Sequence, residues 1–153
     1  MRYFANRQVA ISREDEAKFI EGLVASETDH VFSIFHVHDN VPGPNPPPEY
    51  VGQCALHQDG TAGRLFVVIC YEHQGRGYAR AAILRLLAYA WDVLNLTRVT
   101  LLVRSDHYEA HSLYRTCGFH RHSHLPRSYK LGDTLVDMDR MSIDNPRRAK
   151  AAC

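Results

Sequence analysis

The sequence predicts a single domain built on a mixed α/β sheet, and three observations lead to this prediction. The chain has 153 residues, which is enough to bury one sizeable core without disulfides or a metal. Hydrophobic residues make up 45% and charged residues 23%, a composition typical of folded domains. Short strand-like runs alternate with amphipathic segments in the order α-β-β-β-α-β-α-β-β, which favours a sheet covered by helices.

The charge balance and the apolar pattern exclude several classes of protein. Eighteen basic residues against 17 acidic ones leave a net charge of +1, which argues against nucleic-acid or membrane-surface binding. The longest apolar run, Leu65–Cys70, is too short to cross a bilayer, and the N-terminus lacks the apolar core of a signal peptide. Four cysteines without CxxC spacing predict free thiols in a reducing compartment. We therefore expect a soluble cytoplasmic domain.

The first elements are a helix and a pair of strands. Ser12 followed by three acids predicts a helix start, because the side chain caps free amides and the acids complement the helix dipole. Val31–Val37 and Tyr50–Leu56 are rich in β-branched and aromatic residues and predict paired strands. Five of the seven prolines lie between them, in 42–48, so that segment is predicted to be an exposed hairpin loop. A ligand for a proline-binding domain is the less favoured alternative.

The second half contains the sheet centre and two helices. Arg64–Cys70 is continuously apolar after its first residue, which predicts a strand buried on both faces. A helix follows from the turn at Gly77 to about Leu94, and Asn95 is a plausible left-handed terminator. The remaining predicted elements are a strand at 98–104, a helix at 109–117 and closing strands at 119–124 and 134–143. We expect one domain over 1–144, followed by a basic, disordered tail over 145–153.

The turn after the 64–70 strand contains the most informative residues. They are Gln74, Gly75, Arg76, Gly77, Tyr78, Ala79 and Arg80. Free amides and the dipole at a helix N-terminus bind anions, and two arginines one turn apart add charge suited to phosphate. The third glycine of a dinucleotide-binding turn and the lysine of a Walker loop are both absent. The pattern Gln-x-x-Gly-x-Ala remains, and an ordinary strand-to-helix turn is its alternative interpretation.

A second motif lies at the expected distance from this turn. Leu113-Tyr114 followed by Gly118-Phe119 ends a strand-helix block that starts near Val103. In this combination the chain resembles the GNAT superfamily of N-acetyltransferases from about residue 1 to 143. It is most similar to the branch that contains ribosomal-protein alanine and spermidine N-acetyltransferases. The start of the chain resembles the point just after the opening β-α unit of that branch, so we expect this unit to be missing.

The resemblance implies a sheet whose two central strands splay apart to admit the pantetheine arm of acetyl-CoA. It implies that the backbone of Val67, Val68 and Ile69 bonds to pantetheine, while residues 74–80 cradle the pyrophosphate. Tyr114 matches the tyrosine that protonates the departing CoA thiolate, and a packed aromatic ring is its alternative role. The implied activity is transfer of an acetyl group to a primary amine of a small molecule, such as an amino-acid-like metabolite, or of a peptide N-terminus. A non-catalytic acyl-CoA-binding or partner module is the alternative.

Several positions depart from the family's pattern. His107 stands where the family usually has a cofactor-binding asparagine, and an imidazole can also donate or accept a hydrogen bond. Leu102 and Arg64 occupy positions where relatives often have a carboxylate. The candidates for a general base are therefore His107, His111, Glu72 and water, and Arg64 favours an acceptor with an anionic group over a polyamine. Loss of the opening unit would expose a sheet edge, so we expect a homodimer.

Histidines are numerous, with ten in the chain, but they do not lead us to expect a metal. His120, His122 and His124 alternate, which predicts that they share one face of a strand. Pairs of histidines two residues apart on a strand occur in zinc sites, whereas a row of histidines on an edge strand more often forms a solvated face.

Overall fold

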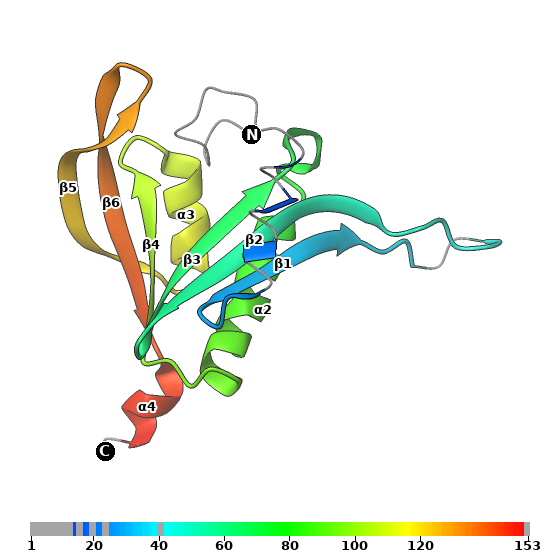
Figure 1. Cartoon of the computed structure of the whole chain (residues 1–153), viewed down its shortest axis with the longest axis horizontal. Helices are drawn as coiled ribbons and strands as arrows, with labels where there is room; N and C mark the ends of the chain where they lie inside the picture. The colour runs from blue at the N-terminus through cyan, green and yellow to red at the C-terminus, as the bar shows by residue number, and fades with distance from the viewer. Residues whose placement is uncertain (1–13, 15–16, 19–20, 23–24, 40–41, 152–153) are drawn as a thin grey trace.

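The computed structural model describes residues 14, 17–18, 21–22, 25–39 and 42–151 (Figure 1). The predicted helix start at Ser12, and the point near Met1 where the resemblance begins, lie outside the described residues. The residues from Glu14 to Ala25 that are described are helical and exposed.

Six strands form one mixed sheet in the order β1-β2-β3-β4-β6-β5. The strands are β1 (Asp29–His36), β2 (Glu49–Asp59), β3 (Ala62–Ile69), β4 (Arg98–Arg104), β5 (His120–Leu131) and β6 (Thr134–Asp144). Only the central pair, β3 and β4, is parallel, and every other pair of neighbours is antiparallel. The predicted mixed α/β sheet is thereby confirmed.

Two helices, α2 (Tyr78–Asp92) and α3 (Tyr108–Thr116), pack on one face of this sheet (Figure 1). The apolar side of α2 contributes its buried residues to one core with the inward-facing residues of β2, β3, β4 and β6. Asn95 has a φ of 52° just after α2, which confirms it as a left-handed terminator. Among the described residues, no helix combines the length and apolarity needed to cross a membrane.

The central strands separate soon after they start. β3 and β4 pair only at Ala62, Gly63 and Arg64, opposite 98–100, and then diverge (Figure 1). We call the region between Leu65–Ile69 of β3 and Leu101–Arg104 of β4 the β3–β4 opening. Its presence confirms the predicted splaying of the two central strands.

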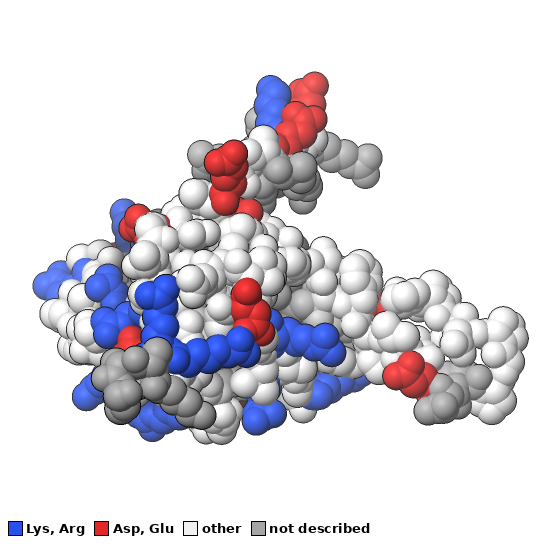
Figure 2. All heavy atoms as spheres, turned by 90° about the horizontal axis from the view of Figure 1, so that it is seen from below, with Lys and Arg blue, Asp and Glu red and all other residues white. Residues whose placement is uncertain are grey.

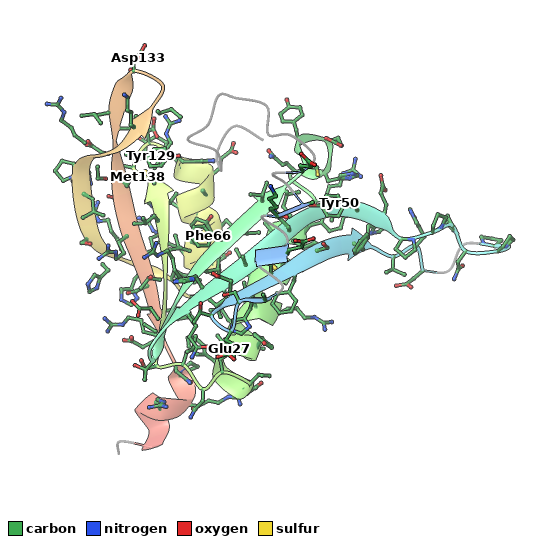
Figure 3. All side chains as sticks on the ribbon, viewed as in Figure 1. Glu27, Tyr50, Phe66, Tyr129, Asp133 and Met138 are labelled. Carbon is green, nitrogen blue, oxygen red and sulfur yellow. The ribbon has the colours of Figure 1, made fainter. Side chains whose placement is uncertain are left out.

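The prediction that the strand at 64–70 is buried on both faces is wrong. Leu65 is buried, and Val67 packs against the core, but Phe66 and Val68 are only half-buried and Arg64 is exposed. The register places Phe66 on the face away from α2 and α3, with Tyr50 of β2 and Met138 of β6 (Figure 3). Among the described residues, helices of the core cover one face only, and this explains why one side of β3 stays partly exposed.

The proline-rich segment is an exposed connection, as predicted. β1 and β2 form an antiparallel hairpin, and the described residues 42–48 between them are exposed and extend away from the sheet (Figure 1). The ring of Phe32 packs against Tyr89 of α2 at a centroid distance of 5.3 Å, which ties the base of the hairpin to the core.

The predicted histidine row is broken by a β-bulge. Arg121 pairs with Met141 and Ser123 pairs with Arg140, so His122 is an extra residue in β5. Because a bulge reverses the alternation of side chains, His120 and His124 lie on opposite faces of the sheet. The expectation that the three histidines share a face is therefore wrong.

The structure also differs from the disordered tail expected over 145–153. Pro146–Ala151 form helix α4, and Asn145 is buried just before it. The Asn145 side chain donates from Nδ2 to the Leu96 carbonyl at 2.8 Å and accepts from the Arg147 N–H at 3.0 Å. Arg147 pairs with Asp92 of α2 and remains exposed. Figure 2 shows Lys and Arg side chains gathered on one face of the molecule. The prediction failed because this order depends on contacts with distant residues.

We predict that Asn145→Ala lowers the free energy of unfolding by about 1–3 kcal/mol, because it leaves the buried Leu96 carbonyl without its donor. Urea denaturation measures this change. Arg148→Ala is the control, because its bond to the Asn95 carbonyl is exposed, and we expect a change within about 0.5 kcal/mol. Equal unfolding midpoints for wild type and Asn145→Ala would contradict the anchoring role.

Candidate active site

The β3 side of the opening presents backbone polar groups. Cys70 N–H donates to the Val51 carbonyl at 2.9 Å, which fixes the alternation of the β2–β3 ladder. By this alternation the polar groups of Val68 point toward β2, while those of Val67 and Ile69 point toward the opening. Pairing with β4 has ended at Arg64, so Val67 and Ile69 lie where a bound molecule could complete the ladder.

Gln74 closes the turn that follows β3. Its side chain donates from Nε2 to the Ile69 carbonyl at 3.1 Å, and the intervening Tyr71–His73 form a single 3-10 turn, η1. This bond uses the Ile69 carbonyl and leaves the Val67 carbonyl and the N–H groups of Val67 and Ile69 directed at the opening. Of the three residues predicted to bond pantetheine, Val68 is therefore the one whose backbone faces the wrong side.

The start of α2 has the features of an anion-binding position. Gly75 and Gly77 have φ values of 74° and 86°, and a Cβ atom on either would meet none of the described residues within 4 Å. The first bond of the helix runs from Ala81 N–H to the Gly77 carbonyl at 3.1 Å, and no side chain caps the helix. The amides of 78–80 thus have no partner within the helix.

The side chains around this turn are also suited to the binding of an anion. Arg76 and Arg80 are exposed, so their guanidinium groups can reach an anion at the helix start. The ring of Tyr78 turns away to pack edge-on against His36 at 5.7 Å and His73 at 6.4 Å. The half-buried Ala79 has no side chain to obstruct the approach. A pyrophosphate group fits the residues present at this turn.

Tyr114 lies on α3, the helix that follows β4. Its ring is half-buried against the core and meets Phe119 edge-on at a centroid distance of 6.2 Å. Burial raises the pKa of the phenol, and the neighbouring Cys117 thiol raises it further. The hydroxyl therefore keeps its proton at neutral pH, as a proton donor must.

The end of α3 lies near the start of α2. Burial raises the pKa of the Cys117 thiol, while a bond from Thr116 and the positive charge of Arg80 lower it in part. The helices α2 and α3 follow the two parallel strands that border the β3–β4 opening and share one apolar core, which brings the helix of Tyr114 to the same edge of the sheet as this turn. The structure thus gathers the predicted turn, the β3 backbone and the Tyr114 helix around one region.

His107 caps the N-terminus of α3. Its Nδ1 accepts from the Ala110 N–H at 3.4 Å, and the ring is exposed. A shallow hollow beside it is lined by Arg104, Asp106, His107, Tyr108 and Glu109. The structure accordingly gives His107 a local role in the helix start that sequence reasoning did not anticipate.

The candidates for a general base are placed very differently. His111 is buried, and its Nε2 lies 3.1 Å from the Arg104 carbonyl and 3.5 Å from Asp139 Oδ2. This nitrogen is therefore engaged in contacts within the fold. Glu72 is exposed in η1, two residues before Gln74. Leu102 and Arg64 are exposed and lie on the face of the sheet away from the helices.

A buried carboxylate, Asp139 of β6, was missed by the sequence analysis. Its side chain is 4% exposed and contacts Ser105, His111 and His124. The signal was available, because Asp139 occupies a core-facing position of a half-buried strand, where an acid needs partners. Within the described ranges no group of three or more His, Cys, Asp or Glu has an arrangement that could hold a metal ion.

Comparison with known proteins agrees with this geometry. The family model described as "Acetyltransferase (GNAT) domain" matches residues 1–120. The spermidine N(1)-acetyltransferase of Vibrio cholerae is 38% identical over 77 residues, which are 50% of this chain and 44% of that protein. The matched segment thus spans less than half of that relative's length.

Solved structures are similar over more of the chain. A Vibrio cholerae spermidine N-acetyltransferase in complex with CoA and spermine is 24% identical, with 88% of this chain and 76% of that one covered at a TM-score of 0.76. A chimera of the Vibrio cholerae spermidine N-acetyltransferase is 22% identical, with 96% and 88% covered at a TM-score of 0.79. At these identities the likeness demonstrates a shared fold.

We predict that Tyr114 titrates above its ordinary pKa of 10.0, because burial disfavours the phenolate. The unfolded chain releases this proton first, so the free energy of unfolding falls as the pH rises above about 10. Ultraviolet difference titration of wild type against Tyr114→Phe isolates this one phenol. Tyr108→Phe, which removes an exposed phenol of the same helix, is the reference. A midpoint at or below 10.0 for Tyr114 would refute its burial.

Proposed function

Since the chain belongs to the GNAT family of acetyltransferases and is thus an acyltransferase, we propose that it moves an acetyl group from acetyl-CoA to a primary amine. The amine belongs to a small molecule, such as an amino-acid-like metabolite, or to a peptide N-terminus. The observation that carries the proposal is the divergence of β3 and β4 directly beside the uncapped start of α2. This arrangement joins a backbone bonding edge to an anion-binding turn.

Two parts of the chain bind the donor, the start of α2 and the β3 strand. The amides of 78–80 and the guanidinium groups of Arg76 and Arg80 bind the pyrophosphate at the start of α2. Val67 and Ile69 extend their ladder to the amide groups of the pantetheine arm along β3. Gly75 and Gly77 keep the turn open, and Gln74 holds it against the end of β3 through the Ile69 carbonyl.

When bound, acetyl-CoA supplies a thioester carbonyl that a neutral amine can attack. The Val67 N–H group, which lies farther from the pyrophosphate turn than Ile69, stabilises the negative charge that develops on the carbonyl oxygen, and the Val67 carbonyl and Ile69 N–H bond the pantetheine arm. The amine nitrogen forms the new bond to carbon as the carbon–sulfur bond breaks, and Tyr114 donates its phenolic proton to the sulfur. The proton lost by the amine balances the one that Tyr114 has given up. Holding both reactants together accounts for much of the rate.

The groups that could take the proton from the amine differ in their burial and contacts. His111 is buried with its Nε2 directed at the Arg104 carbonyl and Asp139, so it is a poor candidate. The exposed His107 and Glu72 remain, together with water. We favour His107 among the side chains because it stands in a hollow at the end of β4, next to the helix that contains Tyr114.

Donor binding is the first test. At about 100 times its dissociation constant, acetyl-CoA should stabilise the fold by about 2.7 kcal/mol, measured as a thermal shift. Gly77→Glu should abolish the shift because it adds negative charge at the phosphate position. Gly77→Ala is the matched control, since it shares the cost of a side chain at a φ of 86° without the charge. A folded protein without any shift would contradict the proposal.

Catalysis is tested with Tyr114→Phe in an assay for thiol release, with spermidine and amino acids as the first acceptors. Loss of the general acid should lower kcat by about 100-fold while the acetyl-CoA shift persists. Acetyl-CoA binding without turnover of any amine would instead favour a non-catalytic acyl-CoA-binding module.

We also propose that the protein is a homodimer. β1 is an edge strand of the sheet that the described residues form, and Val31, Phe32 and Phe35 on it are 40%, 39% and 52% exposed. Edge strands with exposed apolar residues are usually covered by pairing. Sedimentation across micromolar concentrations should give twice the chain mass of 17.5 kDa, and Phe35→Lys should shift the protein toward monomer. A monomeric mass for the wild type would overturn the proposal.

A further inference from the structure

Asp139 is a buried carboxylate that joins four elements of the fold. It lies on β6, opposite Val103 of β4, on the face covered by the helices. Its Oδ1 accepts from the Ser105 hydroxyl at 3.0 Å and lies 2.7 Å from His124 Nδ1 of β5. Burying a carboxylate is costly unless several donors satisfy it, so the position of these donors is strongly constrained.

The second oxygen of Asp139 faces α3. Oδ2 lies 3.5 Å from His111 Nε2, which is also 3.1 Å from the Arg104 carbonyl. His111 is 9% exposed at its side chain, so this link is shielded from water. His111 precedes Tyr114 by three residues, and residues at this spacing lie on the same side of a helix. The link therefore holds the same side of α3 that positions the tyrosine.

The core contacts of α3 with the described residues are apolar. Ala110, Leu113 and Tyr114 pack against the core, together with the buried Cys117 at the end of the helix. Apolar packing is not directional and fixes the rotation and translation of a nine-residue helix weakly. The polar contacts of His111 and of Ser105 are directional, so they constrain the orientation of α3. Both residues contact Asp139.

We propose that Asp139 is a positioning residue for catalysis, which fixes α3 through His111 and Ser105 and thereby sets the place of the Tyr114 hydroxyl. The proposal rests on the proposed function, because it assigns Asp139 an effect only through the general acid. Asp139 itself lies on β6, with β4 between it and β3, and its contacts among the described residues are with Ser105, His111, Arg121 and His124. Its influence should therefore fall on kcat and spare donor binding.

The primary variant is Asp139→Asn, which removes the charge with little change of volume. We expect kcat to fall about 10- to 100-fold through misplacement of the acid, with an unchanged thermal shift by acetyl-CoA. The matched control is Asp144→Asn on the same strand, whose carboxylate pairs with exposed Arg98 and does not touch α3. Its kcat should stay within about twofold of the wild type.

A double-mutant cycle separates positioning from a general structural role. In the Tyr114→Phe background, Asp139→Asn should change kcat by less than about twofold, because there is no acid left to misplace. Equal losses in both backgrounds would overturn the inference and leave the proposed function intact. An unchanged kcat in Tyr114→Phe alone would overturn both the role of Tyr114 and this inference.

A second pair of variants keeps the test decisive if Asp139→Asn fails to fold. His111→Gln retains an N–H donor for the Arg104 carbonyl and Asp139, whereas His111→Leu fills the site without one. We expect His111→Gln to retain at least about tenfold more kcat than His111→Leu, at equal affinity for acetyl-CoA. Equal kcat values in two folded variants would refute a positioning role for this link.

Discussion

The early end of pairing between β3 and β4 is the constraint on which the rest of the structure depends. Three residue pairs hold the two parallel strands together, and beyond Arg64 the backbone of β3 has β2 on one side only. The N–H and C=O groups along this edge of β3 need hydrogen-bond partners from outside the sheet or from a bound molecule. The opening therefore creates both the shape and the bonding capacity of the candidate site.

The divergence is maintained by what each strand leads into. β3 continues through η1 and Gln74 into α2, and β4 continues through Ser105 and His107 into α3. Both helices pack on the same face and share one apolar core, which holds the outer parts of the sheet together while its centre separates. The turn proposed to bind the donor and the proposed general acid, Tyr114, come from the two helices that follow the diverging strands.

Directional polar contacts act where the apolar core is insufficient. Asn145 connects the C-terminal segment to the Leu96 carbonyl, and Asp139 connects β6 to α3 and to β5. Both residues are buried, at 3% exposure each, so their hydrogen bonds are protected from competition by water. The core supplies most of the stability, while these contacts determine where the α3 and α4 helices sit.

Features that depend on local chemistry could be predicted from the amino-acid sequence alone. Asn95 and Gly77 adopt positive φ where the sequence predicts a helix end and a helix start, because backbone sterics act within a few residues. Leu113-Tyr114 with Gly118-Phe119, together with the Gln74–Ala79 pattern, was sufficient to predict the family and its splayed sheet.

Three other features could not be predicted, because they depend on contacts between distant parts of the chain. The bulge at His122 separates the faces of His120 and His124, and the order of 145–151 depends on Asn145 and Arg147 reaching distant partners. Asp139 of β6 meets His111 where α3 packs on the sheet. Each of these outcomes depends on residues far apart along the chain, and pairing of distant residues is set by packing rather than by local propensity.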